Sequence, residues 1–197
     1  MTAGKIKRRI IAKGRGAVFT PPDFLDLGSR AAVDQALSRL AHQGVVRRLT
    51  RGIYDYPKHS PRLGPLSPDP DAVAAAIARK DGRIVQISPA RAANMLGLTT
   101  QVPAKAVYLT DGPTRTKQIG HQTIIMRNAA AKNLAGAGKA TGMVFQALRY
   151  LGKDGVDAAA ISRLAKAINA DTRRALVRDA LQAPGWMRPV AEQIAAA

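Results

Sequence analysis

Residues 57–71 constrain the fold of this chain more than any other stretch, because five of their fifteen positions are proline. Proline lacks a backbone N–H, fixes its own φ angle and moves the preceding residue toward extended backbone. A stretch with this composition leaves no room for a helix. We therefore expect residues 57–71 to form a semi-rigid linker between a domain at 1–56 and a larger one at 72–197.

The chain carries a large excess of positive charge. Its 197 residues include 31 basic and 13 acidic side chains, a formal charge of +18. Such an excess predicts a polyanionic partner, either nucleic acid or an anionic membrane. No apolar run approaches the roughly 18 residues that cross a bilayer. The N-terminus also lacks the apolar core of a signal peptide. We expect a cytoplasmic protein that contacts no membrane.

The first domain carries the higher charge density. Residues 1–65 hold 13 basic and 4 acidic side chains, and the net charge of the remaining two thirds of the chain is no larger. With 46% hydrophobic residues the chain should nevertheless fold. Eight aromatic residues are too few for a platform that stacks single-stranded bases. We therefore expect the contact with nucleic acid to lie in the first domain and to involve a duplex.

The order of elements within residues 1–56 can be read from the sequence. Ile6, Ile10 and Ile11 have helical spacing on a first helix that ends at Gly14. A short extended piece, a short helix opened by two prolines, and a longer third helix should follow. After these, VVRRL and GIYDY are β-rich runs on either side of a turn. Helix, short strand, two helices and a hairpin is the order of a winged helix-turn-helix domain.

The third helix should begin after the N-cap Ser29 and end before Gly44. At 100° per residue, four of its apolar side chains fall in one stripe about 100° wide, which must face the core: Val33, Ala36, Leu37 and Leu40. The opposite face offers the side chains that a recognition helix presents to a major groove. Any surface helix has polar residues opposite its apolar stripe. The prediction therefore rests on the helix, the hairpin and the net charge together.

Asp34 does not fit an exposed face that meets phosphates, because a carboxylate is repelled there. We expect it either to accept from a cytosine amine or to brace Arg30 across one helical turn. The predicted DNA-binding residues comprise the exposed face of the third helix, the hairpin arginines and the first-helix cations that would hold the backbone: Ser29, Arg30, Gln35, Ser38, Arg39, His42, Arg47, Arg48, Arg51, Lys5, Lys7, Arg8 and Arg9.

The stretch DFLDLGSRAAVDQALSRLAHQGVVRRLTRGIYDYP resembles the N-terminal winged helix of AbiEi-type antitoxins, from type IV toxin–antitoxin (abortive infection, phage defence) systems. Beyond the linker, DAVAAAIARKDGRIV, ARAANMLGLTTQVPAKAVYLTDGP and NLAGAGKATG are similar to the second domain of one subgroup. The resemblance implies a repressor that binds repeats in its own promoter. It also implies an antitoxin that counters a nucleotidyltransferase-like toxin without a stable complex. Residues of the third helix and hairpin match the family's recognition helix and wing: Ser29, Arg30, Gln35, Arg39, Arg47, Arg48 and Arg51.

The second domain should be an α+β module with C-terminal helices. We expect a helix from Ala72 to Lys80, a strand from Ile84 to Ile87 and a helix that starts at Ser88-Pro89 and ends at Gly97. Residues 105–127 predict an antiparallel meander of three strands. Further helices are expected near 142–152, 157–168 and 171–183.

Basic residues of this second domain form two sets, one on the meander and one on the last predicted helix. Either set could bind nucleic acid or a substrate shared with the toxin, or could simply be solvated. The first set is Arg115, Lys117, His121 and Arg127, and the second is Arg173, Arg174 and Arg178.

Nothing in the sequence indicates an enzyme, a cofactor or a metal site. NLAGAGKATG departs from the phosphate-loop pattern, with Asn133 in place of the first glycine and Ala140 in place of the hydroxyl residue. We expect its glycines to form a mobile turn. The three histidines lie on different predicted elements, the chain has no cysteine, and Glu192 is its single glutamate. Two alternatives to the antitoxin remain: a module that binds structured RNA, and a stand-alone winged-helix regulator without a toxin partner.

Overall fold

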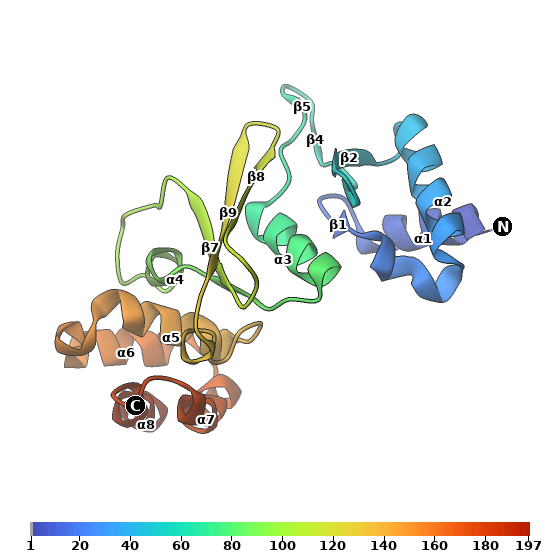
Figure 1. Ribbon diagram of the computed structural model, residues 1–197. Coiled ribbons are helices and arrows are strands. Elements are labelled where there is room, and N and C mark those ends of the chain that lie inside the picture. Colours follow the sequence, from blue (N-terminus) through green and yellow to red (C-terminus); the bar gives the residue numbers. More distant parts are fainter. Residues whose placement is uncertain (1) are drawn as a thin grey trace. The chain divides into compact units, whose positions relative to one another are not determined.

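The computed structural model describes residues 2–197 and has a mixed α+β architecture, which confirms the α+β class expected from the sequence (Figure 1). The chain divides into two compact units. Unit 1 comprises residues up to Arg83 together with Lys117–Ile124, and unit 2 comprises Ile84–Thr116 and Ile125–Ala197. No helix in the part of the chain that the structure describes is both long and apolar enough to cross a bilayer.

Unit 1 begins with three helical elements, α1 (Thr2–Lys13), the 3-10 helix η1 (Pro21–Leu27) and α2 (Arg30–His42). Ile6 and Ile10 of α1 are fully buried, whereas Ile11 is 49% exposed. The buried side chains of α1 pack with Phe19, Phe24 and the apolar stripe of α2 into one core. This core fixes which face of α2 remains outside.

Helix α2 follows the sequence prediction closely. The Ser29 hydroxyl accepts a hydrogen bond from the backbone N–H of Ala32, and Gly44 after the helix has φ +69°. A positive φ is readily adopted by glycine, which explains why the helix ends there. The four apolar residues of the predicted stripe are all buried: Val33, Ala36, Leu37 and Leu40.

A three-stranded antiparallel sheet completes this region, in the order β1-β3-β2. Its strands are β1 (Val18–Phe19), β2 (Arg47–Thr50) and β3 (Ile53–Asp55). The expected hairpin of β2 and β3 is present, with Arg47 opposite Asp55 and a bulge between Arg48 and Thr50. All of β3 is buried.

Residues 57–71, expected to form a linker, lie within unit 1 and contain regular structure. They form a small antiparallel hairpin of β4 (His59–Ser60) and β5 (Gly64–Pro65), and then the start of α3 (Pro70–Asp81). The proline rule holds locally, because the prolines lie outside helices, in extended backbone or in the hairpin turn, or in the first turn of a helix, where the N–H is not needed. The prediction omitted the contacts that hold the hairpin against the preceding strands.

Strands β6 (Val85–Ile87), β7 (Ala106–Thr110), β8 (Arg115–Ile119) and β9 (Gln122–Asn128) form a second sheet, in the order β6-β7-β9-β8. The predicted meander is therefore wrong, because β9 lies between β7 and β8. Burial explains the order. β9 contributes buried Ile124 and Met126 and takes an interior position, whereas the polar β8 lies at the edge, where charged side chains are tolerated.

The remaining helices build the core of unit 2. They are α4 (Pro89–Met95), α5 (Ala140–Leu151), α6 (Ala158–Ala167), α7 (Ala170–Asp179) and α8 (Met187–Ala196), with short 3-10 turns η2 (Ala131–Asn133), η3 (Lys153–Gly155) and η4 (Ala180–Gln182). The sequence did not predict α8, whose Met187, Ala191 and Ile194 are fully buried in this core.

Candidate nucleic-acid interface

The exposed face of α2 carries the predicted recognition residues. Gln35, Ser38, Arg39 and His42 are all exposed. Arg39 forms no ion pair with any residue in the 2–197 range. Because the buried stripe of α2 holds the helix in the core, these polar side chains occupy a rigid element rather than a loop.

Arg30 and Asp34 form an ion pair on the same helix. The Nε atom of Arg30 donates to a carboxylate oxygen of Asp34 at 2.9 Å, one helical turn away. Of the two roles considered for Asp34, the structure shows the brace. The pair is half exposed on both sides, so its contribution to stability is small. It does cancel one positive charge on the predicted face.

Arg47, expected at the DNA backbone, is instead held within the protein. Its Nε and Nη2 atoms donate to the two carboxylate oxygens of Asp55 at 3.1 and 2.6 Å, and Nη2 also donates to the carbonyl of Leu66 at 2.8 Å. The Asp55 side chain is 1% exposed, so this carboxylate depends on Arg47 for its charge balance. We assign Arg47 a structural role.

The other two arginines of the β2–β3 hairpin remain available. Arg48 and Arg51 are exposed and form no ion pair within the described chain. The carbonyl of Arg51 accepts a hydrogen bond from Nζ of Lys80, on α3, at 2.8 Å. Lys80 therefore adds a third cation at this turn. Its place at this turn was not predicted, because the sequence assigned residues 72–80 to the other domain.

On α1, Arg9 differs from the other three basic residues that were expected to hold the DNA backbone. Arg9 makes a bidentate pair with Asp26 of η1, with both distances 2.6 Å. This hydrogen-bonded contact raises the pKa of Arg9 and lowers the pKa of Asp26. Lys5, Lys7 and Arg8 are exposed and lack any acidic partner among the residues described. Arg9 thus joins α1 to η1, and the other three can face a polyanion.

Among the basic residues of α7, Arg174 pairs with Asp171, and Arg178 lies 3.6 Å from Asp179. The expected sets on β8, β9 and α7 are thus partly engaged, and Arg115 also has a partner within the protein. His121 and Arg127 are exposed. These residues do not form a site that the geometry defines.

The glycine-rich segment before α5 is organised around an internal carboxylate. The buried Asp179 accepts hydrogen bonds from the Thr141 hydroxyl at 2.8 Å and from Nζ of Lys139 at 3.2 Å. Lys139, at the lysine position of the phosphate-loop pattern, and the hydroxyl of Thr141, two residues later, are therefore bound to a side chain of the protein. Gly142 lies in α5 against the carbonyl of Gly136, so the expected mobile turn extends into a packed helix.

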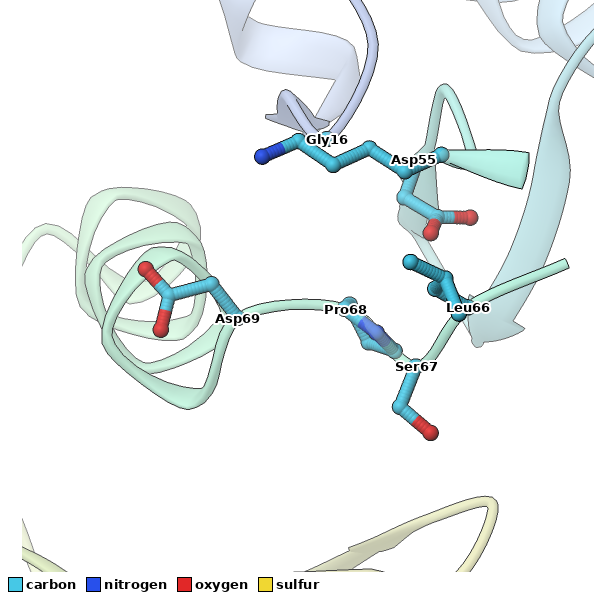
Figure 2. A pocket seen from close by; sticks show the side chains of 7 residues that line it. Gly16, Asp55, Leu66, Ser67, Pro68 and Asp69 are labelled. Carbon is cyan, nitrogen blue, oxygen red and sulfur yellow. The ribbon is translucent and has the colours of Figure 1, made fainter. Parts of the chain in front are cut away.

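Unit 1 also contains a pocket of about 160 Å³ beside the β4–β5 hairpin. Figure 2 shows residues on its wall, among them Asp55, Leu66 and Asp69. Its volume is below that of usual small-molecule sites. Its buried acid, Asp55, is already paired with Arg47. Within residues 2–197, no group of three or more potential ligand side chains could hold a metal ion.

These observations define a class of protein: a mixed α+β protein whose first unit carries exposed basic side chains without an ion pair among the described residues. The chain belongs to a family of unknown function, DUF6088, whose model matches residues 5–176. The crystal structure of the Rv2827c protein from Mycobacterium tuberculosis is similar at 14% sequence identity and a TM-score of 0.43, over 99% of this chain and 76% of that chain. No curated protein sequence matches this chain.

Proposed function

We propose that residues 1–56 form a winged helix-turn-helix that binds a specific double-stranded DNA site, with α2 as the recognition helix. The order of α1, β1, η1, α2, β2 and β3 supports this proposal. In this arrangement η1 and α2 are the two helices of the helix-turn-helix, and the β2–β3 hairpin is the wing.

One observation carries the proposal: the cations of unit 1 divide into two groups. Arg9, Arg30, Arg47 and Arg79 each pair with a carboxylate of the same unit. Several exposed cations without an ion pair within the described residues lie on the elements that a winged helix applies to DNA: Lys5, Lys7, Arg8, Arg39, Arg48 and Arg51. Others lie elsewhere in the unit, among them Arg15, Lys58 and Arg62. An unpaired, exposed cation can exchange its water for a phosphate and release a counterion from the duplex.

The chemistry of each element suggests its role. The guanidinium of Arg39 can donate to both acceptors of guanine in the major groove, and the amide of Gln35 can pair with adenine. Ser29, Ser38 and His42 lie on or next to the same helix and add hydroxyl and imidazole contacts. Arg48, Arg51 and the α1 cations would bind phosphates, which fix register without reading sequence.

We further propose that the protein is the antitoxin of a type IV toxin–antitoxin pair and represses its own operon in the cytoplasm. The support is the resemblance to AbiEi-type antitoxins over both parts of the chain. The expected partner is a nucleotidyltransferase-like toxin encoded beside it, without a stable complex. Co-expression with the neighbouring gene tests this role, since an antitoxin should restore growth that the gene product alone arrests.

DNA binding is tested by titrating the full chain with its own upstream duplex at two salt concentrations, against unrelated duplex and structured RNA as competitors. Specific recognition predicts binding that survives excess unrelated duplex. Arg39→Ala should weaken the free energy of DNA binding by about 1–3 kcal/mol and reduce the discrimination among bases at one position. The matched control is Arg163→Ala, which removes an exposed charge from α6.

Two outcomes would contradict the proposal. Equal displacement by every competitor would mean that the charge of +18 acts as a nonspecific attractant for polyanions. Preferential displacement by RNA would favour the RNA-binding alternative, since a wing and a basic helix can also contact A-form RNA through phosphates and 2′-hydroxyls.

A further inference from the structure

The β4–β5 hairpin presents an apolar side chain to solvent at the tip of a rigid arm. Leu63 is 78% exposed, and Arg62 beside it is also exposed. The turn is fixed, since the backbone N–H groups of Arg62 and Leu63 both donate to the Ser60 hydroxyl at 3.3 Å. Gly64 follows at φ +68°. Leu63 is thus held outward by an ordered turn.

Both ends of the arm are fastened to the body of unit 1. At its start, Arg15 donates to the carbonyl of Pro57 at 2.9 Å and contacts the ring of His59 at 3.1 Å. The Arg15 guanidinium also lies 4.6 Å from the centroid of the Tyr56 ring. At its end, Arg47 donates to the carbonyl of Leu66. Figure 1 shows the hairpin projecting from the neighbouring strands of this unit.

We propose that this hairpin is a second DNA-contacting arm, which inserts Leu63 into the minor groove while Arg62 binds at the groove edge. The inference rests on the proposed DNA binding of unit 1. Proteins that enter the minor groove combine arginine with an apolar wedge such as leucine. The charge of the arm favours nucleic acid over a protein partner, since Arg62 is exposed at the tip, Lys58 is exposed near the start of the arm, and Asp55 at its base is neutralised.

The order of the arm strengthens the inference. A flexible tip would lose conformational entropy on binding, whereas a turn held by Ser60 and by flanking prolines is already restricted. With α2 assigned to the major groove, an arm of the same unit could supply contacts that α2 does not make. Leu63 would then bury surface that is costly to leave in water.

The test measures binding of the full chain to its own upstream duplex, with and without netropsin as a minor-groove competitor. Leu63→Ala should weaken binding about tenfold, the loss expected when a buried leucine is truncated, and leave the salt dependence unchanged. Leu63→Met, which keeps a large apolar side chain, should bind the duplex as tightly as the wild type does. Arg62→Ala should lower the salt slope by about one. Netropsin should weaken DNA binding by the wild type more than it weakens DNA binding by the Leu63→Ala variant. The control is Leu181→Ala, another leucine 68% exposed.

Failure of the arm proposal and failure of the proposed function give different results. If Leu63→Ala binds as the wild type does while Arg39→Ala is weakened, the arm is not a DNA contact and the proposed function stands. If the wild type shows no preference for any duplex, both proposals fail. If Leu63→Ala lowers the sedimentation coefficient of the protein without DNA, the tip mediates contact between copies, which also overturns this inference.

Discussion

Arg47 and Asp55 form a bidentate ion pair across the β2–β3 hairpin, with nitrogen–oxygen distances of 3.1 and 2.6 Å. The pair joins three segments, because Nη2 of Arg47 also donates to Leu66 at the end of the β4–β5 hairpin. Its neighbour Arg48 has no such partner in the described chain. Two adjacent arginines therefore have opposite roles, and their substitution should separate stability from DNA binding.

Arg47→Ala should destabilise the fold. It would leave the Asp55 carboxylate buried without its counter-charge, a change that costs about 3–5 kcal/mol in fully buried pairs. Because the Arg47 side chain is 35% exposed, water can replace part of the lost contact. We expect a loss of about 2–3 kcal/mol on this reasoning. Urea denaturation measures it, and a loss below 0.5 kcal/mol, the usual range of surface substitutions, would contradict the structural role.

Arg48→Ala should show the reverse pattern. The exposed side chain holds no carboxylate, so the free energy of unfolding should change by less than about 0.5 kcal/mol. Affinity for every duplex should fall alike, and the slope of log affinity against log salt should decrease by about one, as expected for one lost phosphate contact. An unchanged slope would remove Arg48 from the proposed interface.

Local sequence signals were enough to predict α2. Ser29 satisfies an N–H of the first turn, Gly44 adopts positive φ, and the apolar stripe repeats with the helical period. Each of these depends on residues within a turn or two. The elements of residues 1–56 were predicted in order for the same reason. The winged-helix assignment itself stays a proposal.

The features that were not predicted depend on contacts between residues that are distant in the sequence. Nothing in the local pattern distinguishes Arg47 from Arg48, because the difference lies in a carboxylate eight residues away. Arg9 and Asp26 are 17 residues apart. The proline-rich stretch looked like a linker because its stabilising contacts come from Arg15 and Arg47, outside the stretch. The order of β7, β9 and β8 likewise depends on burial, which neighbouring residues do not specify.

Asp179 should make the folding stability of the protein depend on pH. Burial alone would raise the pKa of Asp179, but hydrogen bonds from Thr141 and Lys139 and the charge of Arg178 hold it below its ordinary value of 3.8. A carboxyl with a lowered folded-state pKa stabilises the protein above its unfolded pKa, and this stabilisation disappears as pH falls through the folded value. The wild type should therefore lose stability below pH 3.8.

The matched variant is Asp179→Asn, which keeps the shape but cannot ionise. It should be less stable than the wild type at pH 7, and the gap should narrow as the wild-type carboxyl becomes protonated. Urea denaturation over a series of pH values measures this gap. A difference that is constant across the series would mean that the charge of Asp179 contributes nothing.

Gly142→Ala should destabilise unit 2 through steric overlap. A Cβ atom at this position would lie 2.2 Å from the carbonyl oxygen of Gly136 and 2.9 Å from Oε1 of Gln86. The backbone of the glycine-rich segment would have to shift, and overpacking of this kind costs about 1–3 kcal/mol. Gly4→Ala provides the contrast, because nothing lies within 4 Å of its Cβ position in α1. There alanine should stabilise by about 0.5–1 kcal/mol through helix propensity. Thermal unfolding of both variants tests the pair, and equal shifts would mean that the segment before α5 yields without cost.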